Sequence, residues 1–241
     1  MNCLKGSKYV FLVTCEHGGN QVPPEFRKLF RDSRSLLDSH RGWDIGAYYV
    51  ATKLAEDLQA RLFHSNITRL LIDLNRSPHH RQLYSEITGK LPVKLTEKIF
   101  KKYYQPYRSK VELWIRNKIN RGKGIIHISS HSFTPVLNGK TRSADIGLLY
   151  DPERKAETEY CRKLKRLLLE QAAGLNIRRN YPYRGNADGF TTYLRRQFSG
   201  DDYLGIELEI NQILTGKKDK TFPRLLDMLV KSIMLVQDDC I

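Results

Sequence analysis

The chain has 241 residues, of which 40% are hydrophobic and 28% charged, a composition typical of a globular protein with one sizeable core. No stretch approaches the roughly 20 apolar residues of a membrane span, and the N-terminal residues lack the apolar core of a signal peptide. Four cysteines without a CxxC pair argue against a disulfide framework or a zinc ribbon: Cys3, Cys15, Cys161 and Cys240. We therefore expect one domain over residues 1–241, in a reducing, cytoplasmic compartment.

The formal net charge of +15 raises the question of a nucleic-acid partner, because clustered lysines and arginines release phosphate counterions. Here the basic residues are spread over several segments and do not alternate with aromatic residues in a known nucleic-acid-binding motif. The pattern favours a solvated basic surface that attracts small anionic substrates. We therefore expect neither a nucleic-acid nor a membrane partner.

Apolar runs rich in β-branched residues predict strands at Tyr9–Cys15, Arg61–His64, Arg69–Leu74, Gly124–Ser130, Ala144–Tyr150 and Tyr203–Ile210. Apolar residues at helical spacing predict helices at Ile45–Leu58, Thr96–Ile119, Lys155–Ala172 and Phe222–Val236. Pro106 removes a backbone donor, so we expect the second helix to kink there. The alternation of strands and helices is typical of a three-layer α/β/α domain with a mixed, mostly parallel sheet.

The first predicted strand ends in the segment EHGGN at Glu16–Asn20, which combines reactive side chains with two glycines. Open α/β sheets bind their ligands at the carboxyl edge of the strands, and glycines let the backbone approach such a ligand closely. The strand predicted at Gly124–Ser130 runs directly into His131. Two strand-end histidines, His17 and His131, predict a metal site that the fold assembles from distant parts of the chain.

A hydrolytic zinc site needs three protein ligands and one position for water, so a third ligand is required. Asp44 is our preferred candidate, although an aspartate before a predicted helix could equally be its N-cap. Glu16 is adjacent to His17, but neighbours on an extended strand point to opposite faces. Asn20 offers only a neutral amide, which is a poor ligand for zinc.

Asn75 and Arg76 follow the predicted strand Arg69–Leu74. An amide and a guanidinium group side by side can bind a carboxylate, whereas the alternative is a surface turn. We expect the two histidines just beyond them, His79 and His80, to be exposed loop residues.

Glu207 and Glu209 alternate with isoleucine and leucine in the last predicted strand, so both carboxylates share one face. Carboxylates in so apolar a strand are costly unless they serve a site or a partner. One of them could take a proton from water at the metal, and ion pairing with arginine is the alternative.

The segment Asn180–Arg195 is rich in glycine, polar and aromatic residues and runs into a short predicted helix. Such a loop suits a specificity wall or a lid. Arg184 and Arg195 could each bind an anion, and surface ion pairs would explain them equally well.

Six segments together resemble the N-formylglutamate amidohydrolase family, which is related to zinc-dependent carboxypeptidases and aspartoacylase: Cys15–Asn20, Trp43–Ala47, Ile72–Arg76, Tyr104–Tyr107, Ser130–Pro135 and Leu208–Gln212. The resemblance covers roughly residues 8 to 212. It implies a phosphorylase/hydrolase-like α/β fold with one zinc ion per chain.

The resemblance also implies individual roles. The zinc ligands would be His17, Asp44 and His131. The groups that bind substrate carboxylates would be Asn75, Arg76, Arg184 and Arg195. Glu209 would match the general base more closely than Glu207.

The chain departs from a histidine-pathway deformylase at three of these positions. It has Glu16 where those enzymes have proline, Asn20 where they have threonine, and Asp44 where they have histidine. The resemblance therefore supports the type of reaction more directly than it supports the identity of the substrate.

These observations predict a zinc-dependent amidohydrolase that cleaves a linear amide of a small carboxylate-bearing substrate, an N-formyl or N-acyl amino acid such as N-formylglutamate. One alternative is a divergent, inactive protein of the same fold that binds anions or nucleic acid. Another is a zinc amidase that acts on cell-wall-type peptides.

Overall fold

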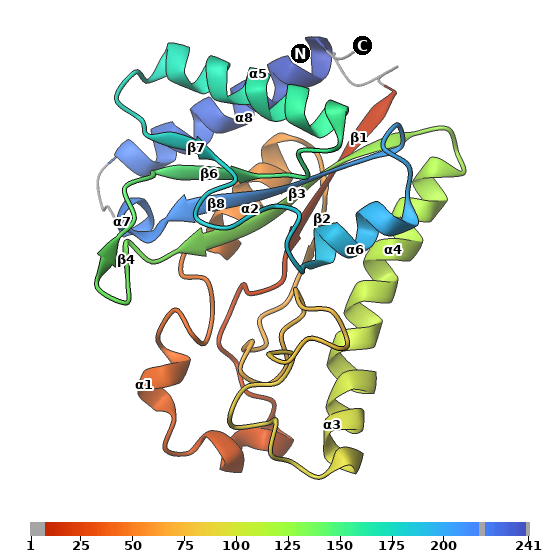
Figure 1. The fold of residues 1–241 in the computed structure, drawn as a ribbon, viewed down its shortest axis with the longest axis vertical. Helices are drawn as coiled ribbons and strands as arrows, with labels where there is room; N and C mark the ends of the chain where they lie inside the picture. The colour runs from red at the N-terminus through yellow and green to blue at the C-terminus, as the bar shows by residue number, and fades with distance from the viewer. Residues whose placement is uncertain (1–7, 217–219, 240–241) are drawn as a thin grey trace.

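The computed structural model describes residues 8–216 and 220–239. Its main sheet has the strand order β2-β1-β3-β8-β6-β7 (Figure 1). The strands are β1 (Tyr9–Cys15), β2 (Arg61–His64), β3 (Gly124–Phe133), β6 (Ile146–Leu149), β7 (Ile177–Arg179) and β8 (Tyr203–Asn211). A separate hairpin consists of β4 (Val136–Leu137) and β5 (Lys140–Thr141). The expectations for the N-terminal segment, Cys3 and Cys240 lie outside the described residues.

The sheet is mixed and mostly parallel, as the sequence predicts. Strands β2, β1, β3 and β8 run parallel to one another, whereas β6 pairs antiparallel with β8. In the register between β3 and β8, Ser129 lies opposite Glu207 and His131 lies opposite Glu209. This register brings the second strand-end histidine beside a glutamate from a strand that is almost 80 residues away in the sequence.

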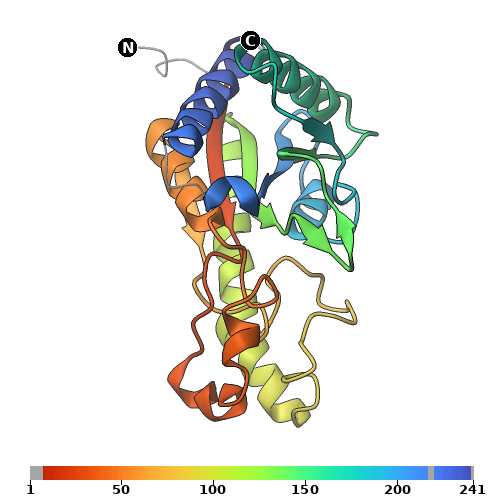
Figure 2. The same cartoon turned by 90° about the vertical axis from the view of Figure 1, so that its left-hand side faces the viewer.

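Helices cover both faces of the sheet, which confirms the predicted three-layer α/β architecture (Figures 1 and 2). One face carries α2 (Ala47–Asp57), α5 (Lys155–Gln171) and α8 (Thr221–Asp239). The other carries α4 (Gln105–Ile119) and α6 (Phe190–Gln197). The shorter helices are α1 (Arg34–Leu37), α3 (Val93–Ile99), α7 (Gln212–Thr215) and a 3-10 helix at Pro24–Phe30.

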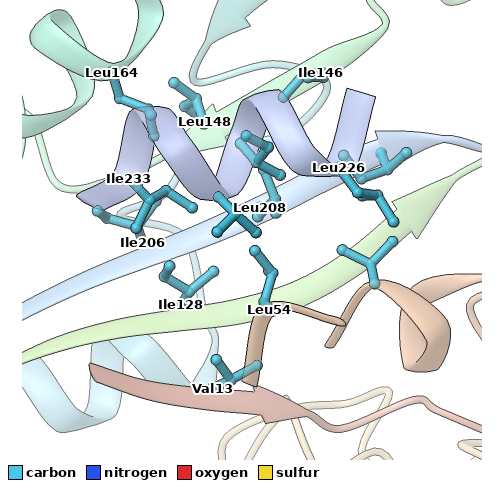
Figure 3. Packing of buried hydrophobic residues seen from close by; sticks show 14 of the residues in the cluster. Val13, Leu54, Ile128, Ile146, Leu148, Leu164, Ile206, Leu208, Leu226 and Ile233 are labelled. Atoms are coloured by element: carbon cyan, nitrogen blue, oxygen red, sulfur yellow. The ribbon is translucent and has the colours of Figure 1, made fainter. Parts of the chain in front are cut away.

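The largest hydrophobic cluster lies between the sheet and α2, α5 and α8 (Figure 3). Alternate residues of the central strands point into it, including Ile128 from β3 and Leu208 from β8. Because side chains alternate along a strand, the intervening residues of β3 and β8 face the opposite side. His127, Ser129 and His131 therefore share one face of β3, and Glu207 and Glu209 share the corresponding face of β8.

The prediction of a strand at Arg69–Leu74 is wrong. Its apolar residues are buried, but in a second cluster that lies outside the sheet, with side chains from the 3-10 helix and α3. The backbone forms turns, and the carbonyls of Leu70 and Leu71 accept hydrogen bonds from the hydroxyl groups of Ser85 and Thr88. Burial therefore explains the apolar pattern without strand pairing.

The long helix predicted at Thr96–Ile119 exists as α3 and α4, joined by a π-helical segment at Phe100–Tyr104. Pro106 lies at the start of α4, where its ring would clash with a carbonyl one turn earlier and its missing N–H leaves that carbonyl unpaired. A widened turn relieves this clash, so the irregularity lies just before the proline.

Within the described residues, none of the helices has the length and apolar character needed to cross a membrane. Cys15 and Cys161 are buried free thiols.

Candidate active site

His17 lies directly after β1, where the chain turns beside the end of β2. The N–H of Gly18 donates to the carbonyl of Ser65 at 3.0 Å. A Cβ atom at Gly19 would lie 2.8 Å from the carbonyl oxygen of Asn66. The sequence suggests that these glycines admit a ligand, but in the structure they let two chain segments pack closely behind His17.

Asp44 reaches the same place from the loop before α2. Its backbone N–H donates to the carbonyl of His17 at 3.0 Å. Its side chain does not cap α2, whose N-cap is Gly46 with a positive φ of 86°. The N-cap alternative is therefore wrong, because the carboxylate of Asp44 turns toward the histidines.

His17, Asp44 and His131 form the group of side chains that could hold a metal ion in the described part of the chain. The Nδ1 atoms of the two histidines lie 3.5 and 2.8 Å from Oδ2 of Asp44, respectively. All three residues are buried, with at most 5% of each exposed. Three potential ligand atoms thus converge at one point.

The far nitrogen of each histidine is held by another group. Nε2 of His17 donates to Oδ1 of Asp73 at 2.7 Å, and Nε2 of His131 lies 3.0 Å from the hydroxyl of Ser129. Because a carboxylate can only accept, the proton of neutral His17 resides on Nε2 and leaves Nδ1 as a bare acceptor. Partners of this kind commonly orient metal-binding histidines.

The donor set fits a divalent metal ion on two grounds. First, the buried Nδ1 of His17 has no hydrogen-bond partner, although it lies near the carboxylate of Asp44. Second, burial alone would raise the pKa of Asp44, yet the charge of Arg69 and the hydrogen bond from His131, together with the adjacent imidazole of His17, hold this pKa well below its usual range. Two imidazole nitrogens and an ionised carboxylate are a ligand set that zinc accepts.

Arg69 forms an ion pair with Oδ1 of Asp44, the oxygen that does not face the histidines. The two carboxylate oxygens of Asp44 thus serve different partners. No role for Arg69 follows from the sequence, because the turn that carries it has the apolar pattern of a strand. The sequence feature that could have identified Arg69 is its position next to a buried apolar run.

Glu209 lies beside the metal-binding group, opposite His131 in the sheet register. Burial raises the pKa of Glu209 to about 8, and its Oε2 atom has no hydrogen-bond partner. Glu207 differs, because its Oε1 accepts a hydrogen bond from the hydroxyl of Thr191 at 2.5 Å. Glu209 thus has a pKa and a free oxygen suited to proton transfer near neutral pH.

A cavity of about 200 Å³ opens in front of these groups. It is lined by His17, Asp44, His131, Glu207 and Glu209, together with Asn75, Arg76, Arg69, Arg142, Tyr183, Arg184 and Asp188 among others. The cavity thus combines a candidate metal site, an acid–base group and several arginines.

Asn75 and Arg76 line this cavity from the turn that follows Asp73. Oδ1 of Asn75 accepts the N–H of Phe190 at 2.7 Å, so the amide NH₂ is the group left to donate to a ligand. Nη1 of Arg76 donates to the carbonyl of Asp188 at 3.2 Å. Both predicted residues therefore lie at the cavity, although in a turn rather than after a strand.

Arg184 also lines the cavity and is exposed. Its guanidinium group has neither a hydrogen bond nor an ion pair with the described residues. Nearby, Arg142 lies over the ring of Tyr183 and donates to its hydroxyl at 3.2 Å. This wall can bind an anion at a distance from the metal-binding group.

Arg195 does not line the cavity, and its prediction as a substrate-binding residue is corrected. Its side chain is buried and pairs with Glu157, with both Nε–O distances at 3.0 Å. It also donates to the carbonyls of Gly185 and Gly205 at 2.6 Å each. Its N–H groups thus bind acceptors inside the fold and connect α5, α6 and β8.

The two alternative ligands lie elsewhere. Asn20 donates to the carbonyl of Leu37 at 3.1 Å and to Asp38 at 2.9 Å. Glu16 is buried behind His131, with Oε2 at 3.4 Å from its Nε2, on the side away from Asp44. Neither faces the point where the three ligand atoms converge.

The family model for N-formylglutamate amidohydrolase matches residues 9–215. Among solved structures, gene product Atu2144 from Agrobacterium tumefaciens is similar with a TM-score of 0.77 and 27% identity, over 96% of this chain and 93% of that chain. The N-formylglutamate amidohydrolase from Ralstonia eutropha JMP134 shares the fold, with a TM-score of 0.71 and 17% identity over 98% and 95% of the two chains. Comparison with curated proteins gives no sequence match. The chain therefore belongs to the N-formylglutamate amidohydrolase family, whose members hydrolyse amide C–N bonds.

Proposed function

We propose that this protein is a zinc-dependent amidohydrolase that removes the formyl or another small acyl group from an N-acyl amino acid of the N-formylglutamate type. The observation that carries the proposal is the convergence of the Nδ1 atoms of His17 and His131 with the carboxylate of Asp44 beside Glu209, at the wall of a cavity lined with arginines. Family membership supports the choice of an amide bond as the target.

His17, Asp44 and His131 would hold the metal ion. When bound, such an ion polarises the carbonyl of the amide and lowers the pKa of a water molecule toward 7. The partly buried ion pair between Arg69 and Asp44 keeps that carboxylate ionised and oriented.

Glu209 is the proposed general base. Its free Oε2 atom accepts a proton from the attacking water, and the same carboxyl group then donates this proton to the leaving amine. A pKa near 8 suits both directions of transfer, because the group can gain and lose a proton close to neutral pH.

The arginines and Asn75 orient the substrate. The amide NH₂ of Asn75 and the guanidinium group of Arg76 would bind the α-carboxylate, and Arg184 would bind a second carboxylate at the far wall. Holding both ends of a small diacid places its amide bond against the reacting groups.

Metal content and hydrolysis test this proposal together. We expect purified wild-type protein, loaded with zinc, to hold about one ion per chain by plasma mass spectrometry and to release formate from N-formyl-L-glutamate. His17→Ala and His131→Ala should lose both properties. His79→Ala is the matched control, since His79 is exposed and outside the cavity. A folded wild-type protein that binds no metal after loading would overturn the proposal.

A further inference from the structure

A buried relay of polar groups lies behind His131, on the side away from the cavity. The hydroxyl of Ser129 lies 3.0 Å from Nε2 of His131 and donates to Oε2 of Glu16 at 2.8 Å. The other carboxylate oxygen, Oε1, accepts a hydrogen bond from the hydroxyl of Tyr107 at 3.0 Å. Glu16 and Ser129 are each 1% exposed, so water does not compete for these contacts.

The directions of these hydrogen bonds determine where the protons lie. A serine hydroxyl has one proton, and Ser129 gives it to Glu16. Its oxygen can then only accept from His131, so Nε2 of the histidine must carry a proton. Nδ1 of His131 donates to Oδ2 of Asp44 at 2.8 Å, because a carboxylate can only accept, and this proton is the one that a metal ion would replace.

Because Ser129 holds the Nε2 proton, Nδ1 is the nitrogen of His131 that remains for a metal ion. This nitrogen lies at the point where His17 also directs its Nδ1 atom, which has no hydrogen-bond partner. Asp73 imposes this tautomer on His17 through a direct hydrogen bond. For His131 the corresponding carboxylate is that of Glu16, which acts through the hydroxyl of Ser129.

A buried carboxylate is costly unless it serves a partner. Glu16 is not among the residues that line the cavity, so it is not placed to touch a substrate. Its side-chain contacts include Ser129, Tyr107 and, at 3.4 Å, Nε2 of His131. These contacts suit Glu16 to fix the orientation and the tautomer of His131.

We propose that Glu16 and Ser129 are positioning residues that hold His131 in its Nε2–H tautomer and thereby tighten metal binding at Nδ1. This inference rests on the proposed metal site and goes beyond it, because it assigns a function to two residues that touch neither the metal ion nor the substrate.

The test is zinc affinity, measured by competition with a chromogenic chelator. Ser129→Ala removes the hydroxyl without adding volume, and we expect it to weaken zinc binding about 10- to 100-fold, as the loss of such outer partners typically does. Glu16→Gln should shift affinity in the same direction, because a neutral amide oxygen is a weaker acceptor than a carboxylate.

Ser130→Ala is the matched control. Ser130 is the next residue of the same strand and is fully buried, but its hydroxyl donates to the carbonyl of Ala47 at 2.9 Å. Its zinc dissociation constant should match that of the wild type. In zinc-loaded protein labelled with ¹⁵N-histidine, a slowly exchanging Nε2 proton of His131 should appear in the wild type and Ser130→Ala, and be lost in Ser129→Ala.

Unchanged zinc affinity in a folded Ser129→Ala protein would overturn the relay and leave the proposed function intact. Should Ser129→Ala fail to fold, unchanged affinity in Glu16→Gln would overturn it equally. A wild-type protein that binds no zinc would overturn both the relay and the proposed function, which separates the two failures.

Discussion

His17 and Asp73 form a buried hydrogen bond of 2.7 Å between Nε2 and Oδ1, and the same oxygen accepts the backbone N–H of Asn75 at 2.9 Å. One carboxylate oxygen thus ties a metal-binding histidine to the turn that carries Asn75 and Arg76. The metal site and the substrate-binding turn are therefore coupled through Asp73.

This coupling predicts that Asp73→Ala affects both metal and substrate. Zinc affinity should fall about 10- to 100-fold because His17 loses its orienting partner. The KM should also rise even at saturating zinc, because the Asn75 turn loses an anchor. Chelator competition and steady-state kinetics measure the two effects. Asp188→Ala is the control for the first effect: it changes the cavity wall without a contact to either histidine, so a similar loss of zinc affinity there would contradict this account.

Glu209→Gln should retain zinc and the fold while kcat falls by about 10² to 10⁴, the usual contribution of a general acid–base group. The amide keeps the shape of the side chain but does not accept and return the proton. Glu207→Gln provides the comparison, because Glu207 is bound to Thr191 and should lose far less activity. Equal losses in the two variants, measured at matched zinc content, would argue against Glu209 as the base.

The two arginines of the segment Asn180–Arg195 should respond in opposite ways to replacement by methionine. Arg184→Met should raise KM for N-formyl-L-glutamate at least about tenfold, the equivalent of 1.4 kcal/mol. Its stability should change by less than about 0.5 kcal/mol, because the side chain is exposed.

Arg195→Met should instead destabilise the protein by about 3–5 kcal/mol, since it leaves the buried carboxylate of Glu157 without its ion-pair partner. Denaturant unfolding checks this value, and KM should stay near that of the wild type in the folded fraction. A stable Arg195→Met protein with a raised KM would restore Arg195 to the substrate-binding set.

His127 predicts a specific loss of stability in acid. Burial lowers its pKa from 6.5 to about 4, so it stays neutral in the folded protein at pH 5 while it is protonated in the unfolded chain. Its stabilising contribution is therefore complete above pH 6.5 and is lost as the pH falls from 6.5 toward 4.

Between pH 7 and pH 5 this difference amounts to about 2 kcal/mol of unfolding free energy. His127→Gln should be less stable at pH 7, because the hydrogen bonds to Thr14 and Tyr203 are disturbed, but its stability should decline less between the two pH values. Urea denaturation at both pH values measures the change. An equal decline in the wild type and the variant would show that His127 is not its source.

The sequence was sufficient to place His17 and His131 together, because each follows a strand with a clear apolar pattern and parallel strands end at one edge of a sheet. It also placed Glu207 and Glu209 on one face, because side chains alternate along β8. Strands β1 and β3 are neighbours and β8 adjoins β3, so these expectations met in one place.

The prediction failed where burial comes from outside the sheet. The apolar residues of Arg69–Leu74 pack in the second cluster, whose other members are Ile67 and residues within 22–37 and 83–107. A short apolar run has the same pattern in a buried strand and in a buried turn, so periodicity alone did not distinguish them.

The sequence by itself determined the order of the long helices and of strands β1, β2, β3, β6 and β8, the apolar faces of the central strands and the strand-end positions of the two histidines, because these depend on neighbours within a few residues. Only the tertiary structure decided that the carboxylate of Asp44 faces the histidines, that Arg184 lines the cavity while Arg195 is buried against Glu157, and that Glu16 lies behind His131. Each of these outcomes depends on contacts between residues far apart in the chain, and the direction of a loop side chain follows from those contacts rather than from its own neighbours.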